Sequence, residues 1–77
     1  MDKQDVIKKI IKEISFVTAV KEEKIETSEP IKNYADFFEN QEILTEIGDI
    51  FEVNPVDIEN KNTIEEIASF IIEREEY

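Results

Sequence analysis

The chain of 77 residues contains no cysteine and no histidine. It therefore cannot form a disulfide, lacks the ligands of an ordinary zinc site, and has neither a thiol nucleophile nor the usual general base near neutral pH. Carboxylates such as Glu42 and Glu46 share a helix face, but solvated carboxylates do not act as an acid and a base without a pocket that sets them apart. We expect no catalytic residue and no enzyme activity.

Two further kinds of segment are missing. Residues 57–62 weakly resemble the start of a calcium loop, but Lys61 falls on the third ligand position and no glycine stands at the sixth, so we expect no metal site. No run of about 18 apolar residues exists, nor a basic start leading into an apolar segment. We therefore expect no membrane partner and a cytoplasmic location.

Acidic residues are spread unevenly along the chain. Residues 1–32 hold seven acidic residues and seven lysines, whereas residues 33–77 hold thirteen acidic residues against only Lys61 and Arg74. The net charge of −11 therefore arises in the second part. Such a surface repels nucleic-acid phosphates and anionic lipids, and it attracts basic protein patches. The alternative is that these acids only form a solvated face.

Apolar residues at helical spacing predict a helix near each end of the chain. The last helix is expected to begin at a capping box made by Thr63 and Glu66 and to reach about Arg74, with a frayed tail over residues 75–77. The β-branched segment 16–20 is expected to end the first helix. The first helix is expected over residues 1–16, with apolar positions at Val6, Ile7, Ile10, Ile11 and Ile14.

The central segment, residues 34–53, combines an apolar stripe with an acidic stripe. Asp36 is placed to cap this helix, and Pro55 ends it because the residue before a proline disfavours helical backbone. Gly48 costs about 1 kcal/mol relative to alanine unless a neighbour packs close to it. On a helical wheel the apolar stripe contains Ile43, Leu44, Ile47, Ile50 and Phe51, and the acidic stripe contains Glu39, Glu42, Glu46 and Asp49.

The connections between the helices carry four apolar residues that we expect to act as anchors. They are Ile25 and Ile31 in the irregular segment 21–33, and Val56 and Ile58 in a single short turn within 54–62. Together these features predict one all-α domain over residues 1–77. We expect a small bundle of three long helices and one short helix.

This order of elements resembles the acyl carrier protein family over nearly the whole chain. That family has a Gly-x-Asp-Ser-Leu motif at the start of its second helix, where the serine hydroxyl carries a 4′-phosphopantetheine arm. A gapless overlay, anchored on the acidic helix that ends at Val53, places the motif on Tyr34-Ala35-Asp36-Phe37-Phe38. The resemblance implies an acyl-carrier-like bundle and a role related to fatty acid, polyketide or peptide biosynthesis.

Only the aspartate of that motif is present, because Phe37 stands where the family has its serine. A phenyl ring has no nucleophilic oxygen, so we expect no 4′-phosphopantetheine at this position and no other cofactor. Ser28, in a predicted surface loop, is the alternative attachment residue, whereas Ser15 and Ser69 fall inside predicted helices. A functional acyl or aminoacyl carrier that uses Ser28 therefore stays open as an alternative.

Two neighbouring phenylalanines stand at the start of the central helix. Aromatic residues usually lie in cores, so we expect Phe37 to turn inward and fill the helix entrance. Phe38 falls on the acidic side of the wheel, where an exposed ring surrounded by acids is a candidate contact residue. The predicted partner-binding residues are Phe38, Glu39, Glu42, Glu46 and Asp49.

The sequence thus predicts a monomeric acyl carrier protein-like binding or regulatory module that lacks the phosphopantetheine arm. Its acidic helix is expected to bind a basic patch of a partner protein, and the resemblance implies an acyl-transferring or ligase-type enzyme as that partner. Nucleic acid is not an expected partner. An acidic inhibitor that mimics nucleic acid and occupies a basic groove is the second alternative.

Overall fold

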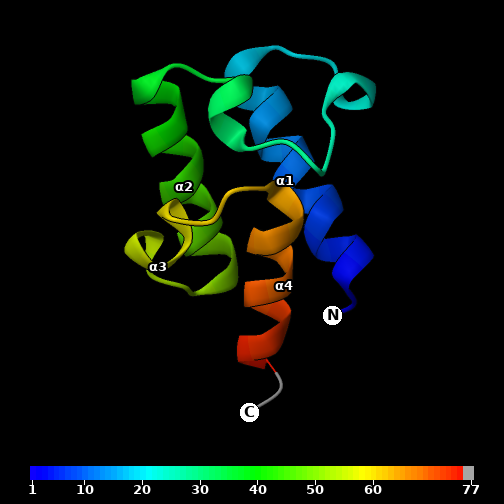
Figure 1. The fold of residues 1–77 in the computed structure, drawn as a ribbon, viewed down its shortest axis with the longest axis vertical. Helices are drawn as coiled ribbons and strands as arrows, with labels where there is room; N and C mark the ends of the chain where they lie inside the picture. Colours follow the sequence, from blue (N-terminus) through cyan, green and yellow to red (C-terminus); the bar gives the residue numbers. More distant parts are fainter. Residues whose placement is uncertain (76–77) are drawn as a thin grey trace.

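The computed structural model describes residues 1–75, which form four α-helices and two 3₁₀ turns without any strand (Figure 1). The predicted all-α bundle of three long helices and one short helix is confirmed. The elements in chain order are α1 (Lys3–Thr18), η1 (Glu22–Lys24), η2 (Ile31–Asn33), α2 (Phe37–Phe51), α3 (Pro55–Glu59) and α4 (Ile64–Glu75).

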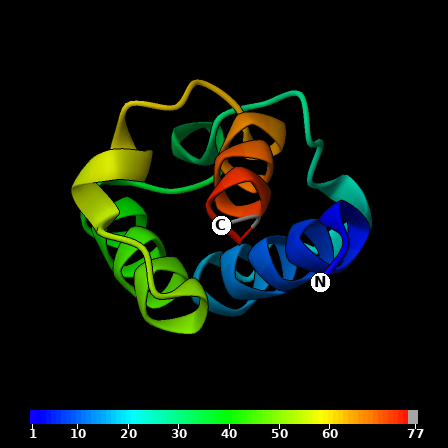
Figure 2. The ribbon, with the colours of Figure 1, turned by 90° about the horizontal axis from the view of Figure 1, so that it is seen from below.

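The long helices pack around a shared interior. Helix α1 runs antiparallel to both α2 and α4 and packs against each of them, while the short α3 lies beside α2 (Figures 1 and 2). As a result, the end of α1 lies at the same end of the bundle as the start of α2. This arrangement brings residues near 16 and residues near 37, which are far apart in the sequence, toward one another.

The core is almost entirely aliphatic. None of the five phenylalanines is buried, although all five lie within residues 1–75. Each buried isoleucine contributes about 1.5–3 kcal/mol to folding, so these aliphatic side chains carry most of the stability. The buried side chains are Val6, Ile7, Ile10, Ile14, Ile25, Ile31, Ile43, Leu44, Ile47, Val53, Ile58, Ile64, Ile67, Ala68 and Ile71.

The predicted cap of the central helix is confirmed and forms a complete capping box. The Glu39 backbone N–H donates to Asp36 Oδ1 at 2.8 Å, and the Asp36 N–H donates to Glu39 Oε1 at 2.9 Å. At α4, the Glu66 N–H donates to Thr63 Oγ1 at 3.1 Å, as predicted. The second bond of the box differs from the prediction, because the Glu66 carboxylate accepts from the Asn62 N–H instead of the Thr63 N–H.

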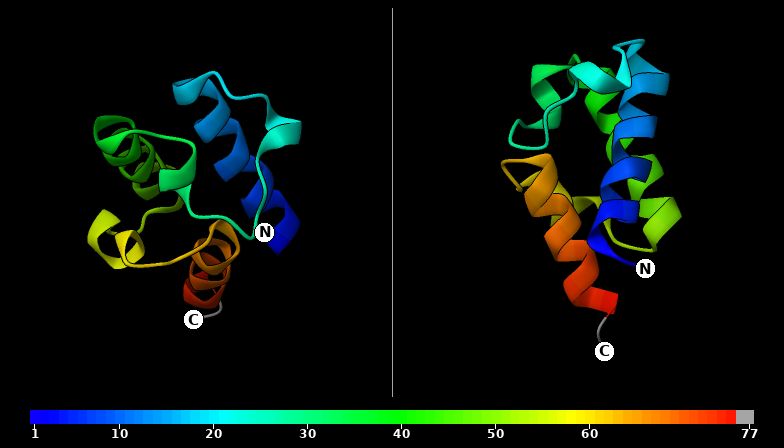
Figure 3. Two further views of the ribbon diagram at one scale, coloured as in Figure 1. Left: turned by 45° about the horizontal axis from the view of Figure 1, so that its top comes forward. Right: turned by 90° about the vertical axis from the view of Figure 1, so that its right-hand side faces the viewer.

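The first long connection is held on the start of α4 by backbone hydrogen bonds (Figure 3). The Ile64 N–H donates to the Glu29 carbonyl at 3.1 Å, and the Glu65 N–H donates to the Thr27 carbonyl at 3.0 Å. These bonds satisfy two amides that a helix start leaves without partners. The predicted anchors Ile25 and Ile31 are both buried on the same connection.

Several helix boundaries and burial predictions need correction. Ile50, predicted on the apolar stripe, is 40% exposed because it lies at the edge of that stripe. Val56 is 60% exposed and does not anchor the short turn, whereas Ile58 is fully buried and does. The first helix continues through Thr18, and α4 includes Glu75, so the rest of the predicted frayed tail lies outside the described residues.

Gly48 is required by close packing. A Cβ atom at this position would lie 2.7 Å from the Val53 carbonyl oxygen and 3.0 Å from Pro55 Cγ. Helix propensity alone favours Gly48→Ala by about 1 kcal/mol, but a contact with backbone cannot be relieved by turning a side chain. The sequence predicted that Gly48 would be costly unless a neighbour packs close to it, and the structure shows that Val53 and Pro55 do so.

We expect Gly48→Ala to lower the free energy of unfolding by about 1–3 kcal/mol, because the clash outweighs the gain in propensity. Gln41→Ala, at an exposed position of the same helix, is the matched control and should stay within about 0.5 kcal/mol of the parent. Chemical denaturation followed by circular dichroism measures both. A Gly48→Ala protein more stable than the parent would contradict the packing.

Candidate protein-interaction site

Phe37 and Phe38 are the first two residues of α2, and their side chains are 70% and 80% exposed. Their rings meet edge to face, with centroids 5.6 Å apart and planes at 82°. The prediction that Phe37 turns into the core is wrong. Tyr34 and Ala35 already pack against the core just before the helix begins, which leaves both rings in solvent.

The acidic stripe of α2 continues along the helix from these rings. Glu42, Glu46 and Asp49 are exposed, and helical geometry places them within about 80° of Phe38 around the helix axis. Glu39 is half-buried, and its carboxylate is engaged in the capping box. The five predicted partner-binding residues thus lie on one helix, but Glu39 also has a structural role.

Phe16 is a third exposed aromatic residue, which the sequence analysis did not identify. It lies near the end of α1, is 83% exposed, and borders a groove of about 490 Å³ between α1 and α2. A sequence signal was present, since Phe16 falls about 200° from Ile14 and so off the apolar stripe of its helix. The groove is lined by Lys12, Glu13, Ser15, Phe16, Val17, Glu22, Glu42 and Glu46.

Among the described residues, the acidic stripe of α2 has no counter-ion. Within residues 1–75 the ion pairs are Met1 N with Glu75 Oε2 at 3.7 Å and Lys3 Nζ with Glu65 Oε1 at 3.2 Å, and both join the start of α1 to α4. The two cations of the acidic second part, Lys61 and Arg74, both lie on the Phe70 ring of α4.

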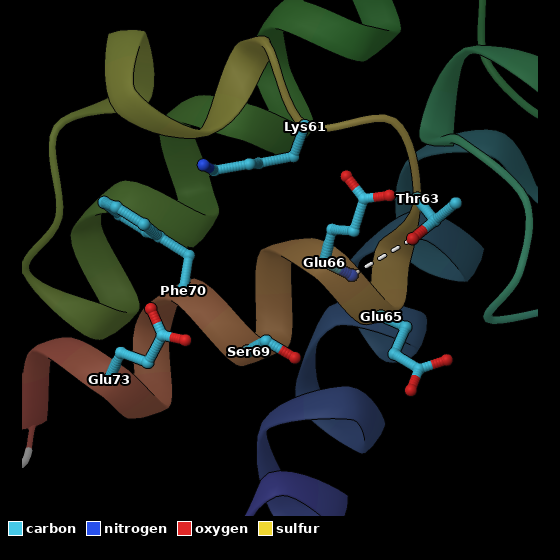
Figure 4. A pocket seen from close by; sticks show the side chains of 7 residues that line it. All are labelled: Lys61, Thr63, Glu65, Glu66, Ser69, Phe70 and Glu73. Carbon is cyan, nitrogen blue, oxygen red and sulfur yellow. Dashed lines mark hydrogen bonds between the residues drawn. The ribbon is translucent and has the colours of Figure 1, made fainter.

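Lys61 and three glutamates line a shallow hollow of about 410 Å³ on α4 (Figure 4). Lys61 Nζ lies 4.9 Å from the Phe70 ring centroid, and the Thr63 hydroxyl accepts the Glu66 N–H. Because these polar groups already stabilise the ring and the helix start, the hollow offers few free groups to a ligand. Its lining consists of Lys61, Thr63, Glu65, Glu66, Ser69, Phe70 and Glu73.

A smaller hollow of about 250 Å³ lies where η2, α2 and the segment after α3 meet. Its apolar lining consists mainly of Ile31, Leu44, Ile58 and Ile67, each of which is at most 5% exposed. Little apolar surface is therefore available there. Lys32, Lys61 and Glu59 also line this hollow, so its charges are mixed.

The serines lie in different surroundings from Phe37. Ser28 is exposed, but it stands between Thr27 and Glu29, whose carbonyl groups accept from the first turn of α4. Ser28 therefore belongs to the start of α4 rather than to the start of α2. Ser15 and Ser69 are half-buried within α1 and α4, as their predicted helical positions imply.

In the part of the chain that the structure describes, no group of three or more acidic side chains is placed to hold a metal ion. Over the same residues, no helix has both the length and the apolar character needed to cross a membrane. The most exposed large apolar side chains of these residues are the three phenylalanines, and the acidic stripe lies beside them.

Comparison with family models, with curated proteins and with solved structures finds no match to this chain. No relative therefore supplies a ligand, a partner or a site residue. What this surface binds has to follow from its own chemistry: exposed rings at one end of α1 and α2, and carboxylates without internal counter-ions next to them.

Proposed function

We propose that this protein is a non-catalytic binding module that docks on a basic surface of a partner protein through the acidic face of α2. The exposure of the phenylalanines carries the proposal. Phe16, Phe37 and Phe38 are each at least 70% exposed, while the core is filled by aliphatic residues instead. Large rings held in water at one end of a bundle are typical of contact residues at protein interfaces.

Charge and rings have complementary roles in this proposal. Glu42, Glu46 and Asp49 lie on the same side of α2 as Phe38, and no cation among residues 1–75 lies within ion-pair distance of them. Carboxylates of this kind raise the rate of encounter with a basic patch. Once contact is made, the ring of Phe38 is buried by the partner and supplies most of the affinity. Phe38 is the proposed anchor, and the carboxylates form its rim.

We further propose that the scaffold is acyl-carrier-like but carries no prosthetic arm. Phe37 is the first residue of α2, directly after the capping residue Asp36, which is the place where the acyl carrier protein family has its serine. No phosphodiester can form on a phenyl ring. The partner would then be an enzyme that handles carriers, of the acyl-transferring or ligase type, in fatty acid, polyketide or peptide biosynthesis.

A charge-reversal pair tests the acidic face. We expect Glu42→Lys/Glu46→Lys to abolish capture of the partner from extract of the source cells at low salt, because both carboxylates lie on the proposed face. The matched control is Glu59→Lys/Glu73→Lys, which changes the net charge equally at exposed positions of α3 and α4. Quantitative mass spectrometry of the captured proteins measures the difference.

Equal loss of capture in both charge-reversal proteins would contradict a specific face, since only net charge would then matter. Release of the captured partner by duplex DNA would favour the nucleic-acid mimic instead. The proposal is supported if the control protein captures as much partner as the parent while the α2 variant captures none.

Enzymatic loading with 4′-phosphopantetheine tests the proposal that the scaffold is acyl-carrier-like but carries no prosthetic arm. After incubation with a phosphopantetheinyl transferase and coenzyme A, we expect the intact mass of the parent protein to stay unchanged. Phe37→Ser/Phe38→Leu, which restores an Asp-Ser-Leu sequence after Ala35, should gain the mass of one arm if the scaffold is acyl-carrier-like. A mass gain in the parent that Ser28→Ala abolishes would contradict the proposal and establish the carrier alternative.

A further inference from the structure

The groove between α1 and α2 extends the proposed acidic face beyond α2. Phe16 and Val17 supply its apolar wall, and Glu42 and Glu46 of α2 stand across from them. Phe16 is the most exposed of the large apolar side chains in residues 1–75. The groove therefore joins an apolar surface on one helix to carboxylates on the other.

The charge of this groove selects its occupant. Four carboxylates line it, on Glu13, Glu22, Glu42 and Glu46, against the single ammonium group of Lys12. An acidic or neutral segment gains nothing from such a rim, and a second copy of this chain is opposed by its own charge of −11. The complementary ligand has apolar side chains on one side and lysine or arginine beside them.

The shape of the groove selects the conformation of that segment. Its two walls are antiparallel helices, and within residues 1–75 there is no strand edge to which an extended peptide could add. An amphipathic helix laid between helices presents apolar residues at positions i, i+3 or i+4, and i+7. The stretch of α2 from Phe38 to Glu46 is about 12 Å long, which matches about two turns of such a helix.

We propose that the docking element of the partner is a basic amphipathic α-helix seated in the groove between α1 and α2, with Phe16 as its main apolar contact. This inference rests on the proposed function, because it specifies the part of a basic partner that the acidic face receives. Phe38 then contacts the end of the bound helix that lies nearest the start of α2. The carboxylates of Glu42 and Glu46 meet its basic residues.

Three fluorescent peptides test the proposal by anisotropy with the intact protein. The first is a designed 18-residue amphipathic helix with leucines on one face and lysines on the other, the second is a scrambled sequence of the same composition, and the third is an oligolysine of equal charge. We expect the amphipathic peptide to bind at least tenfold more tightly than either of the others. The reason is that only this peptide gathers its leucines on one face of a helix and its lysines on the other, so that both can contact the groove at once.

Substitution of the exposed ring identifies the groove. Phe16→Ser should weaken binding of the amphipathic peptide about tenfold and leave oligolysine binding unchanged, because the ring contributes contact and no charge. Val56→Ser is the matched control, since Val56 is also exposed but lies on α3 away from the groove. Both substitutions replace exposed side chains, and circular dichroism checks that each variant is folded.

The outcomes separate this inference from the proposed function. If Phe16→Ser has no effect while Glu42→Lys/Glu46→Lys still abolishes binding, the groove assignment is overturned and the acidic face stands. If the charge-reversed protein binds all three peptides like the parent, the proposed function fails as well. Self-association of the peptide-free protein in sedimentation, lost in Phe16→Ser, would assign the groove to a second copy and overturn the inference.

Discussion

Isoleucine side chains from all four helices and from the first connection pack together in a core that holds no aromatic ring among residues 1–75. Close packing of these branched side chains holds α1, α2 and α4 together in a chain without disulfides. Phe51 and Phe70 pack against the edge of this core, whereas Phe16, Phe37 and Phe38 are at least 70% exposed and take no part in it. The surface position of these three rings is thus a property of the fold, and it creates the apolar part of the proposed site.

The contacts made by cations are also unevenly distributed among the helices. The cations that make internal contacts act on or near α4, where Lys3 pairs with Glu65 and both Lys61 and Arg74 lie on Phe70. The acids of α2 gain no such partner within the described residues. The ion pairs and cation–π contacts of the described residues therefore involve α4, whereas the carboxylates of α2 keep their negative field beside exposed rings, which is the arrangement that attracts a basic partner.

Local signals predicted the fold well because they depend on neighbours in the sequence. The Asp36 cap, the Thr63 start of α4 and the anchors Ile25 and Ile31 all follow from spacing and residue type. The site was only half predictable. The acidic stripe lies on one helix, but the groove beside Phe16 exists only because α1 and α2 are antiparallel, and the exposure of Phe37 depends on residues that fill the entrance before it.

The most direct test of the account is a map of backbone amide chemical shifts in the ¹⁵N-labelled protein as the basic amphipathic peptide is added. The account predicts that the largest shift changes cluster in residues 12–22 and 37–49, which form the two walls of the groove and the acidic face. Changes spread evenly over every acidic segment, or centred on α4 around Glu65 and Glu73, would contradict it.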